Sequence, residues 1–148
     1  MPHWLKALSL FFLSLFCSAE SELLILQSTD IHSAIFDEDS DSQYSWLRMS
    51  SQIKKLRDQR GKENTLLIDC GDTIQGCLSG TISRGEAAIK MINYLDYDAW
   101  TPGNHELDFG SERFLELCNK TRVPILSGNF QFIPRETFPL SAYKIYHR

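Results

Sequence analysis

Beyond residue 22, short apolar runs alternate along the chain with segments that have helical periodicity. Each apolar run ends at polar or glycine residues, and this alternation is typical of βα units. The second run is apolar almost throughout, which predicts a strand covered on both faces. No internal repeat or linker interrupts the pattern, so it predicts one open α/β layer. The four predicted strands are Leu23 to Ser28, Thr65 to Asp69, Ala99 to Thr101 and Val123 to Ser127.

Three segments between these runs have the spacing of amphipathic helices. From Tyr44 to Arg60, apolar residues recur on one helical face, and Gly61 is placed to end the helix. A second helix is predicted from about Gly85 to Leu95 on the same grounds. Ser111 is expected to cap a third helix that runs through Cys118.

The N-terminus has a different pattern, which predicts a signal peptide. Lys6 precedes an apolar stretch from Ala7 to Phe16, and small residues follow up to Ala19. A basic start, an apolar centre and a small-residue end are the parts of a secretory signal. The apolar stretch is too short to span a bilayer, which takes about 20 residues, so no stable membrane anchor is expected. We therefore expect residues 1–19 to be removed and residues 20–148 to be secreted or periplasmic.

Composition excludes few function classes. The 148 residues are 43% hydrophobic and 23% charged, as in one ordinary globular domain. The formal net charge of −4 argues against binding to a nucleic-acid backbone. Three cysteines follow the predicted signal peptide. A disulfide between Cys70 and Cys77 would close a loop around Asp72, but small buried thiols are the interpretation we favour.

Polar residues with metal-binding side chains follow the first three predicted strands. Asp30 and His32 come after the first strand, Asp72 after the second, and Asn104 and His105 after the third. Ligands of parallel α/β sheets collect at the carboxyl ends of the strands, so these residues are expected to converge. Oxygen donors mixed with imidazole suit Mn²⁺, Mg²⁺, Zn²⁺ or Fe²⁺. Each pattern alone is common turn chemistry, but three in order after successive strands predict a metal site.

These residues form motifs with a known arrangement: Asp30-Ile31-His32, Gly71-Asp72 and Gly103-Asn104-His105-Glu106. Together they resemble the first three motifs of the calcineurin-like metallophosphoesterases. The flanking residues 71–76, 97–110 and 127–130 look like the branch of 5′-nucleotidases and 2′,3′-cyclic-nucleotide phosphodiesterases. The resemblance covers about Leu23 to Phe130. It implies the N-terminal half of an α/β/β/α sandwich, with catalytic loops at the C-terminal ends of the strands.

The resemblance also implies a set of metal ligands. Asp30 and His32 would bind one metal, Asp72 would bridge two metals, and Asn104 would bind the second. An anionic bridge is physically required, since two cations about 3.5–4 Å apart repel each other. A hydroxide held between the two metals would attack the phosphorus of a nucleotide or another phosphate ester.

Three further residues have implied roles outside the metal ligands. His105 would face the substrate, and Asp108 matches the acid that pairs with this histidine. A carboxylate there would select one tautomer and keep the imidazole protonated near neutral pH. Glu106 is expected behind the ligands, hydrogen-bonded to nearby backbone or to a ligand.

The family's later histidine motifs and the nucleotidase branch's C-terminal substrate domain are missing from these 148 residues. After His105, the one further histidine is His147. We therefore expect this chain to be the N-terminal part of a larger hydrolase and to be inactive by itself. Tyr143 to Arg148 are expected to begin a further strand. Two alternatives stay open: a non-catalytic product that binds a metal or a partner, and a metallophosphoesterase acting on a non-nucleotide phosphate ester.

Overall fold

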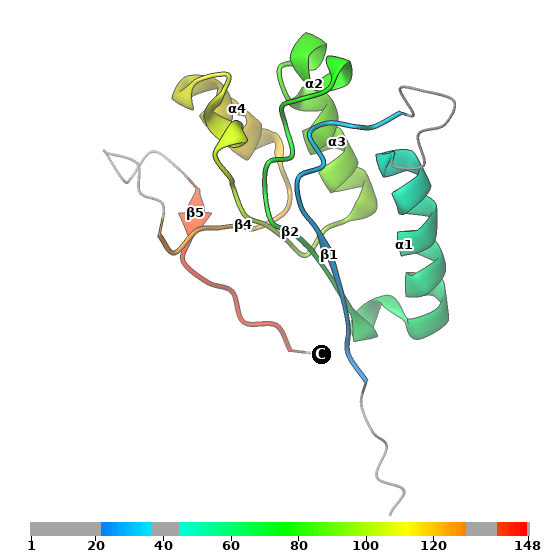
Figure 1. The fold of residues 1–148 in the computed structure, drawn as a ribbon. Helices are drawn as coiled ribbons and strands as arrows, with labels where there is room; N and C mark the ends of the chain where they lie inside the picture. The colour runs from blue at the N-terminus through cyan, green and yellow to red at the C-terminus, as the bar shows by residue number, and fades with distance from the viewer. Residues whose placement is uncertain (1–21, 37–44, 130–138, 148) are drawn as a thin grey trace, which may run out of the picture.

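The computed structural model describes residues 22–36, 45–129 and 139–147. The predicted signal peptide, residues 1–19, lies outside the described residues. The described residues form one sheet of five parallel strands in the order β1-β2-β3-β4-β5 (Figure 1). The strands are β1 (Leu24–Ser28), β2 (Thr65–Asp69), β3 (Ala99–Trp100), β4 (Ile125–Leu126) and β5 (Leu140–Ser141).

Helices connect the first four strands, which confirms the predicted α/β class. The four α-helices are α1 (Trp46–Arg60), α2 (Leu78–Ser83), α3 (Glu86–Leu95) and α4 (Ser111–Lys120). Two 3₁₀ turns, η1 (Lys62–Asn64) and η2 (His105–Leu107), complete the described elements. The short helix α2 was not predicted from the sequence. None of the helices in the described part of the chain is long and apolar enough to cross a bilayer.

One face of the sheet is covered and the other is partly open. Successive parallel strands are neighbours in the sheet, and right-handed crossovers between such strands place the connecting helices on one face. Burial follows this rule in β2, where Leu67 is buried and its neighbours Leu66 and Ile68 are partly exposed. Ile25 in β1 is 59% exposed. The prediction that β2 is covered on both faces is therefore wrong for the described residues.

The covered face holds an aromatic core beneath the loops that carry the predicted site. Trp46, Trp100 and Phe114 are the largest fully buried side chains, and they come from α1, β3 and α4. Trp100 and Phe114 pack edge to face with ring centroids 5.8 Å apart. Burying each of these rings stabilises the fold by roughly 1.5–3 kcal/mol. The core thus links the first helix to the βα unit formed by β3 and α4.

Two boundary predictions are corrected by the structure. Helix α4 begins at Ser111 itself, and the capping position is Gly110, with no side-chain capping hydrogen bond. Gly110 has φ 88°, a value that glycine adopts more readily than serine. Residues 143–147 form no strand, and the last described strand is β5. There the Tyr146 hydroxyl instead donates to the carbonyl of Asp98.

Candidate metal centre

Backbone hydrogen bonds join the loop after β1 to the loop after β2. The amide of Asp30 donates to the carbonyl of Gly71, and the amide of His32 donates to the carbonyl of Asp72, both at 2.9 Å. These bonds continue the pairing of β1 with β2 beyond the ends of both strands. As a result, the first and second sequence motifs are held side by side through their main chains.

The same loops hold four non-glycine residues in left-handed backbone conformations. The φ values are 53° for Asp30, 50° for His32, 56° for Ser33 and 54° for Asp72. Such conformations cost on the order of 1 kcal/mol each, and they cluster at functional sites. Here they turn the chain sharply at the strand ends, where the predicted ligands lie.

Glu106 fastens the third motif to the second. Its side chain is fully buried, and its carboxylate accepts hydrogen bonds from four backbone amides. The donors are Asp72 at 2.9 Å, Thr73 at 2.7 Å, Ile74 at 3.3 Å and Gly103 at 2.6 Å. This agrees with the expectation that Glu106 bonds to nearby backbone. It also shows why a carboxylate suits the position, since every amide points its hydrogen at the same spot.

A second buried carboxylate, missed in the sequence, lies beneath the site. Asp69 ends β2 and is fully buried; it accepts hydrogen bonds from the Ser28 hydroxyl at 2.6 Å, the Gly71 amide at 3.1 Å and the Thr73 hydroxyl. Burial raises the pKa of Asp69 to about 6, although these hydrogen bonds oppose the shift. The one feature of the sequence that could have indicated this buried carboxylate is the position of Asp69 at the end of an apolar run.

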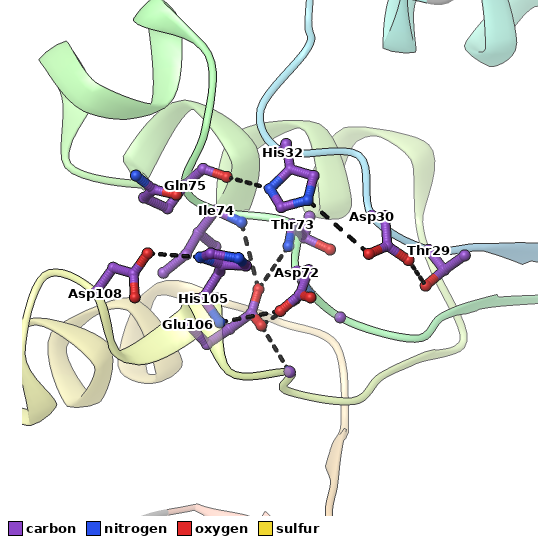
Figure 2. A network of polar contacts seen from close by, with 12 residues as sticks. Thr29, Asp30, His32, Asp72, Thr73, Ile74, Gln75, His105, Glu106 and Asp108 are labelled. Atoms are coloured by element: carbon purple, nitrogen blue, oxygen red, sulfur yellow. Dashed lines mark hydrogen bonds and ion pairs between the residues drawn. The ribbon is translucent and has the colours of Figure 1, made fainter.

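The structure brings three predicted site residues to one point. A nitrogen of His32, a carboxylate oxygen of Asp72 and a nitrogen of His105 all lie within 4.8 Å of one another. Figure 2 shows the imidazole rings of His32 and His105 close to Asp72, and the two rings meet edge to face. Their centroids are 5.0 Å apart. The backbone amide of His105 donates to Oδ1 of Asp72 at 3.0 Å, which holds this carboxylate in place.

Both imidazoles are tied down through their outer nitrogens (Figure 2). Nδ1 of His32 lies 2.9 Å from the carbonyl oxygen of Gln75, and Nδ1 of His105 lies 2.6 Å from Oδ2 of Asp108. Carbonyl and carboxylate oxygens only accept, so each Nδ1 carries a proton. The hydrogen bond with Asp108 is the main reason that the pKa of His105 is raised above its usual value. The predicted pairing of His105 with Asp108 is present.

Of the other two predicted ligands, the Asp30 carboxylate does not join this group. Oδ1 of Asp30 lies 3.9 Å from Nε2 of His32, but its carboxylate is not among the three converging groups. Oδ2 of Asp30 instead accepts from the Thr29 hydroxyl at 2.6 Å. Asn104 is exposed and precedes the η2 turn. His32, Asp72 and His105 are therefore the described acidic and histidine side chains that lie close enough together to hold one ion, and the ligand roles of Asp30, Asn104 and the others stay predictions.

A cavity of about 750 Å³ opens beside the first motif. Asp30 and His32 line one side, and Trp46, Arg48 and Met49 from the start of α1 line the other. Volumes of this size accommodate a small organic ligand. Of the three converging side chains, His32 therefore borders space that a substrate could enter.

The cysteines contribute no disulfide to the site. Within the described residues, no disulfide joins Cys70, Cys77 and Cys118 to one another. Cys118 is buried, and burial raises the pKa of its thiol to about 12. Cys70 is exposed, so the expectation of a buried thiol is wrong there. It directly follows the inward-facing Asp69, and alternation along the strand turns its side chain toward the open face of the sheet.

Sequence comparisons identify the family of this chain. Residues 23–145 match the family model described as calcineurin-like phosphoesterase. The chain is 34% identical over 120 residues to the 5′-nucleotidase of Homo sapiens, an alignment covering 74% of this chain and 21% of that protein. It is 30% identical over 122 residues to the probable 5′-nucleotidase of Treponema pallidum, covering 76% of this chain and 20% of that one.

Solved structures give the same result. The NAD nucleotidase of Haemophilus influenzae superposes with a TM-score of 0.68 at 28% identity, over 78% of this chain and 22% of that chain. The 5′-nucleotidase precursor of Thermus thermophilus superposes with a TM-score of 0.64 at 26% identity, over 72% of this chain and 22% of that chain. The chain thus spans about a fifth of the length of these proteins. It belongs to the calcineurin-like phosphoesterase family.

Proposed function

We propose that this chain is the first part of a metal-dependent phosphoric ester hydrolase that acts on nucleotides, of the 5′-nucleotidase or 2′,3′-cyclic-nucleotide phosphodiesterase type. The observation that carries the proposal is the convergence of His32, Asp72 and His105 at the ends of parallel strands. Relatives named 5′-nucleotidase and a solved NAD nucleotidase support a nucleotide substrate. The names of these relatives describe proteins that are much longer than this chain. We therefore propose the activity and the substrate for the complete protein.

The donors present suit the divalent metals that the family uses. Nε2 of His32 is available as a neutral nitrogen donor because Nδ1 carries the proton, and Asp72 offers a carboxylate beside it. In the complete protein, we propose that Asp30, His32, Asp72 and Asn104 hold two divalent ions. Bound there, the ions would activate a water molecule and offset the charge on the phosphoryl oxygens.

The remaining residues of the site would bind the phosphate ester and keep the metal ligands in position. His105, kept protonated by Asp108, would donate from Nε2 to an oxygen of the phosphate ester as negative charge develops there. Glu106 and the backbone bonds between the first two loops keep Asp72 and His105 in fixed positions. The cavity beside His32 would admit the alcohol portion of the ester.

The proposal includes the arrangement of the whole protein. Residues 1–19 would direct export to the periplasm or the outside of the cell. A relative named as a snake venom 5′-nucleotidase, 34% identical over 129 residues, is compatible with export. Residues 20–148 would form the first part of the metallophosphoesterase domain, and later segments would supply the remaining ligands and the nucleoside-binding domain.

Phosphate release by the complete natural protein tests the proposal. With Mn²⁺ added, we expect hydrolysis of AMP or 2′,3′-cyclic AMP, and a loss of at least about 100-fold in kcat/KM for Asp72→Ala and His105→Ala. Exclusive hydrolysis of a sugar phosphate would assign the protein to a non-nucleotide substrate. Unchanged activity in both variants would remove the catalytic role of this site, and absence of any hydrolysis would favour a binding protein.

A further inference from the structure

We propose that Asp69 and Tyr97 are positioning residues of the hydrolytic site. They are joined through Ser28 into one buried chain of hydrogen bonds that fixes the loop carrying Asp72. The inference rests on the hydrolysis proposed above, because it assigns a role to groups beneath the same site. In this role neither residue binds metal or substrate, and both act through the backbone on either side of Asp72.

Asp69 holds the backbone on both sides of Asp72. Its Oδ1 accepts hydrogen bonds from the amide of Gly71 at 3.1 Å and from the hydroxyl of Thr73. The amide of Thr73 also donates to Glu106, so the loop is held between two buried carboxylates. Asp72 has a φ of 54°. This conformation is unfavourable for a residue other than glycine, and it persists only where surrounding contacts hold it.

A chain of donors runs to Asp69 from the first helix. The Ser28 hydroxyl donates to Oδ2 of Asp69 at 2.6 Å. Because this bond uses the one hydroxyl proton of Ser28, the Tyr97 hydroxyl is the donor in its 2.9 Å contact with Ser28. The indole of Trp46 in turn donates to the Tyr97 oxygen at 3.3 Å. Every hydrogen bond in the chain therefore points toward the carboxylate, and such aligned bonds strengthen one another.

The chain joins the wall of the cavity to the loops that carry the predicted ligands. Trp46 begins α1 and lines the cavity beside His32. Ser28 ends β1, and the loop that carries His32 follows it. Trp46, Ser28 and Tyr97 are all buried. Burial raises the pKa of the Tyr97 hydroxyl to about 12, so this group stays protonated and remains a donor at neutral pH.

The charge of Asp69 is unfavourable for stability at neutral pH. Burial raises its pKa from 3.8 to about 6, so the folded state loses stability as the pH rises between these values. An asparagine would fill nearly the same volume without a charge, but it could accept hydrogen bonds through one side-chain atom in place of two. The carboxylate therefore serves the arrangement of the loop rather than the stability of the fold.

Substitutions in the complete natural protein test the proposal. Asp69→Asn keeps the size of the side chain, and Tyr97→Phe removes one hydroxyl but keeps the ring that packs edge to face on Trp46. With Mn²⁺ and the nucleotide in excess, we expect kcat to fall by about 10–100-fold in Asp69→Asn and by about 3–10-fold in Tyr97→Phe. KM should change by less than about 3-fold in both. Tyr94→Phe is the matched control, since Tyr94 is 61% exposed on α3.

Two measurements on Asp69→Asn do not depend on hydrolysis. Its Mn²⁺ affinity, followed by electron paramagnetic resonance, should be weaker than that of the wild type by about 10-fold or more. Its midpoint of urea unfolding at pH 7.5 should not fall, because the buried charge is removed. A residue that only supported the fold would lower the stability together with the metal affinity.

The double variant tests whether the two residues act through one chain. Once Asp69→Asn has broken the chain, adding Tyr97→Phe should lower kcat by less than about 2-fold further, since effects within one network are not additive.

The proposal would be overturned by a double variant in which the two losses multiply, or by values of kcat and Mn²⁺ affinity that match those of Tyr94→Phe. A fall in stability that accompanies the loss of affinity in Asp69→Asn would also overturn it. In these cases the wild-type protein still hydrolyses nucleotides, so the proposed function stands. If the wild type binds Mn²⁺ without hydrolysis, the proposed function fails and the affinities decide this inference. A wild type that neither binds Mn²⁺ nor releases phosphate overturns both.

Discussion

The side chains of His105 and Asp108 are joined by a hydrogen bond of 2.6 Å from Nδ1 to Oδ2. The two residues are three positions apart and lie at opposite ends of the η2 turn, which brings them to the same side of the chain. This contact orients the imidazole, selects its tautomer and raises its pKa. It therefore favours the protonated imidazole that the proposed role of His105 requires.

The first prediction concerns the pKa of this histidine in the metal-free chain. Because the folded pKa of His105 is raised, its ion pair with Asp108 stabilises the fold fully below about pH 6.5, the ordinary histidine value. That contribution is lost as the pH rises through the folded pKa. In Asp108→Asn, we expect an NMR titration of the His105 ring to give a lower pKa. An unchanged titration would mean that Asp108 does not hold the proton.

Glu106 provides a prediction about stability. Glu106→Ala would leave up to four backbone amides without their carboxylate acceptor, so we expect a loss of about 3–5 kcal/mol in the free energy of unfolding. Urea unfolding at neutral pH measures the change. Glu112→Ala, an exposed glutamate on α4, is the control and should stay within about 0.5 kcal/mol of wild type. Similar small losses in both variants would show that the hydrogen bonds from the four amides to Glu106 do not stabilise the fold.

The buried Asp69 should make stability depend on pH in the opposite sense from an ordinary carboxylate. Its pKa is raised from 3.8 to about 6, so between these values the folded state binds more protons than the unfolded state. Stability should therefore fall by about 2–3 kcal/mol as the pH rises from 4 to 7. In Asp69→Asn this fall should largely disappear from urea unfolding measured across that range. Parallel pH profiles in the two proteins would contradict the prediction.

A glycine in the third motif is required by close packing. A Cβ atom on Gly103 would lie 2.3 Å from Oδ1 of Asp72, well inside van der Waals contact. Gly103→Ala should therefore displace Asp72 and destabilise the chain by about 1–3 kcal/mol, measured by urea unfolding. The control is Gly128→Ala, whose added Cβ would lie 3.6 Å from its nearest neighbour. Equal free energies of unfolding in the two variants would show that Asp72 has room to adjust.

Export and size can be examined on the natural protein. An antibody raised against residues 20–148 should detect, in a secreted or periplasmic extract, a species several times larger than the 17.0 kDa of these 148 residues. N-terminal sequencing of that species should begin at Glu20. A species that keeps residues 1–19 would disprove signal cleavage after Ala19.

Much of the fold could be predicted because it depends on local patterns. The apolar run from Thr65 to Asp69 is the exact extent of β2, and the predicted first strand differs from β1 by one residue. The second predicted helix likewise differs from α3 by a single residue. Periodicity and turn residues determine such elements within a few positions. The order of the three motifs was also local information, and it was enough to indicate the family.

The remaining features depend on which segments meet in space. An apolar run does not show whether one or both faces of its strand are covered. In this sheet the neighbouring strands are consecutive in sequence, so the connecting helices lie on one face and Ile25 on the other face is exposed. Asp69 can be buried because the hydroxyls of Ser28 and Thr73 donate hydrogen bonds to its carboxylate. Gly110 takes the capping position because its backbone has a positive φ.

Within the site, the sequence by itself determined which residue types follow each strand and hence that a metal could bind. Only the tertiary structure decided that His105 joins His32 and Asp72 while Asp30 does not. The physical reason is that bonds between loops distant in sequence, from the amide of His105 to Asp72 and from four amides to Glu106, set where each side chain points.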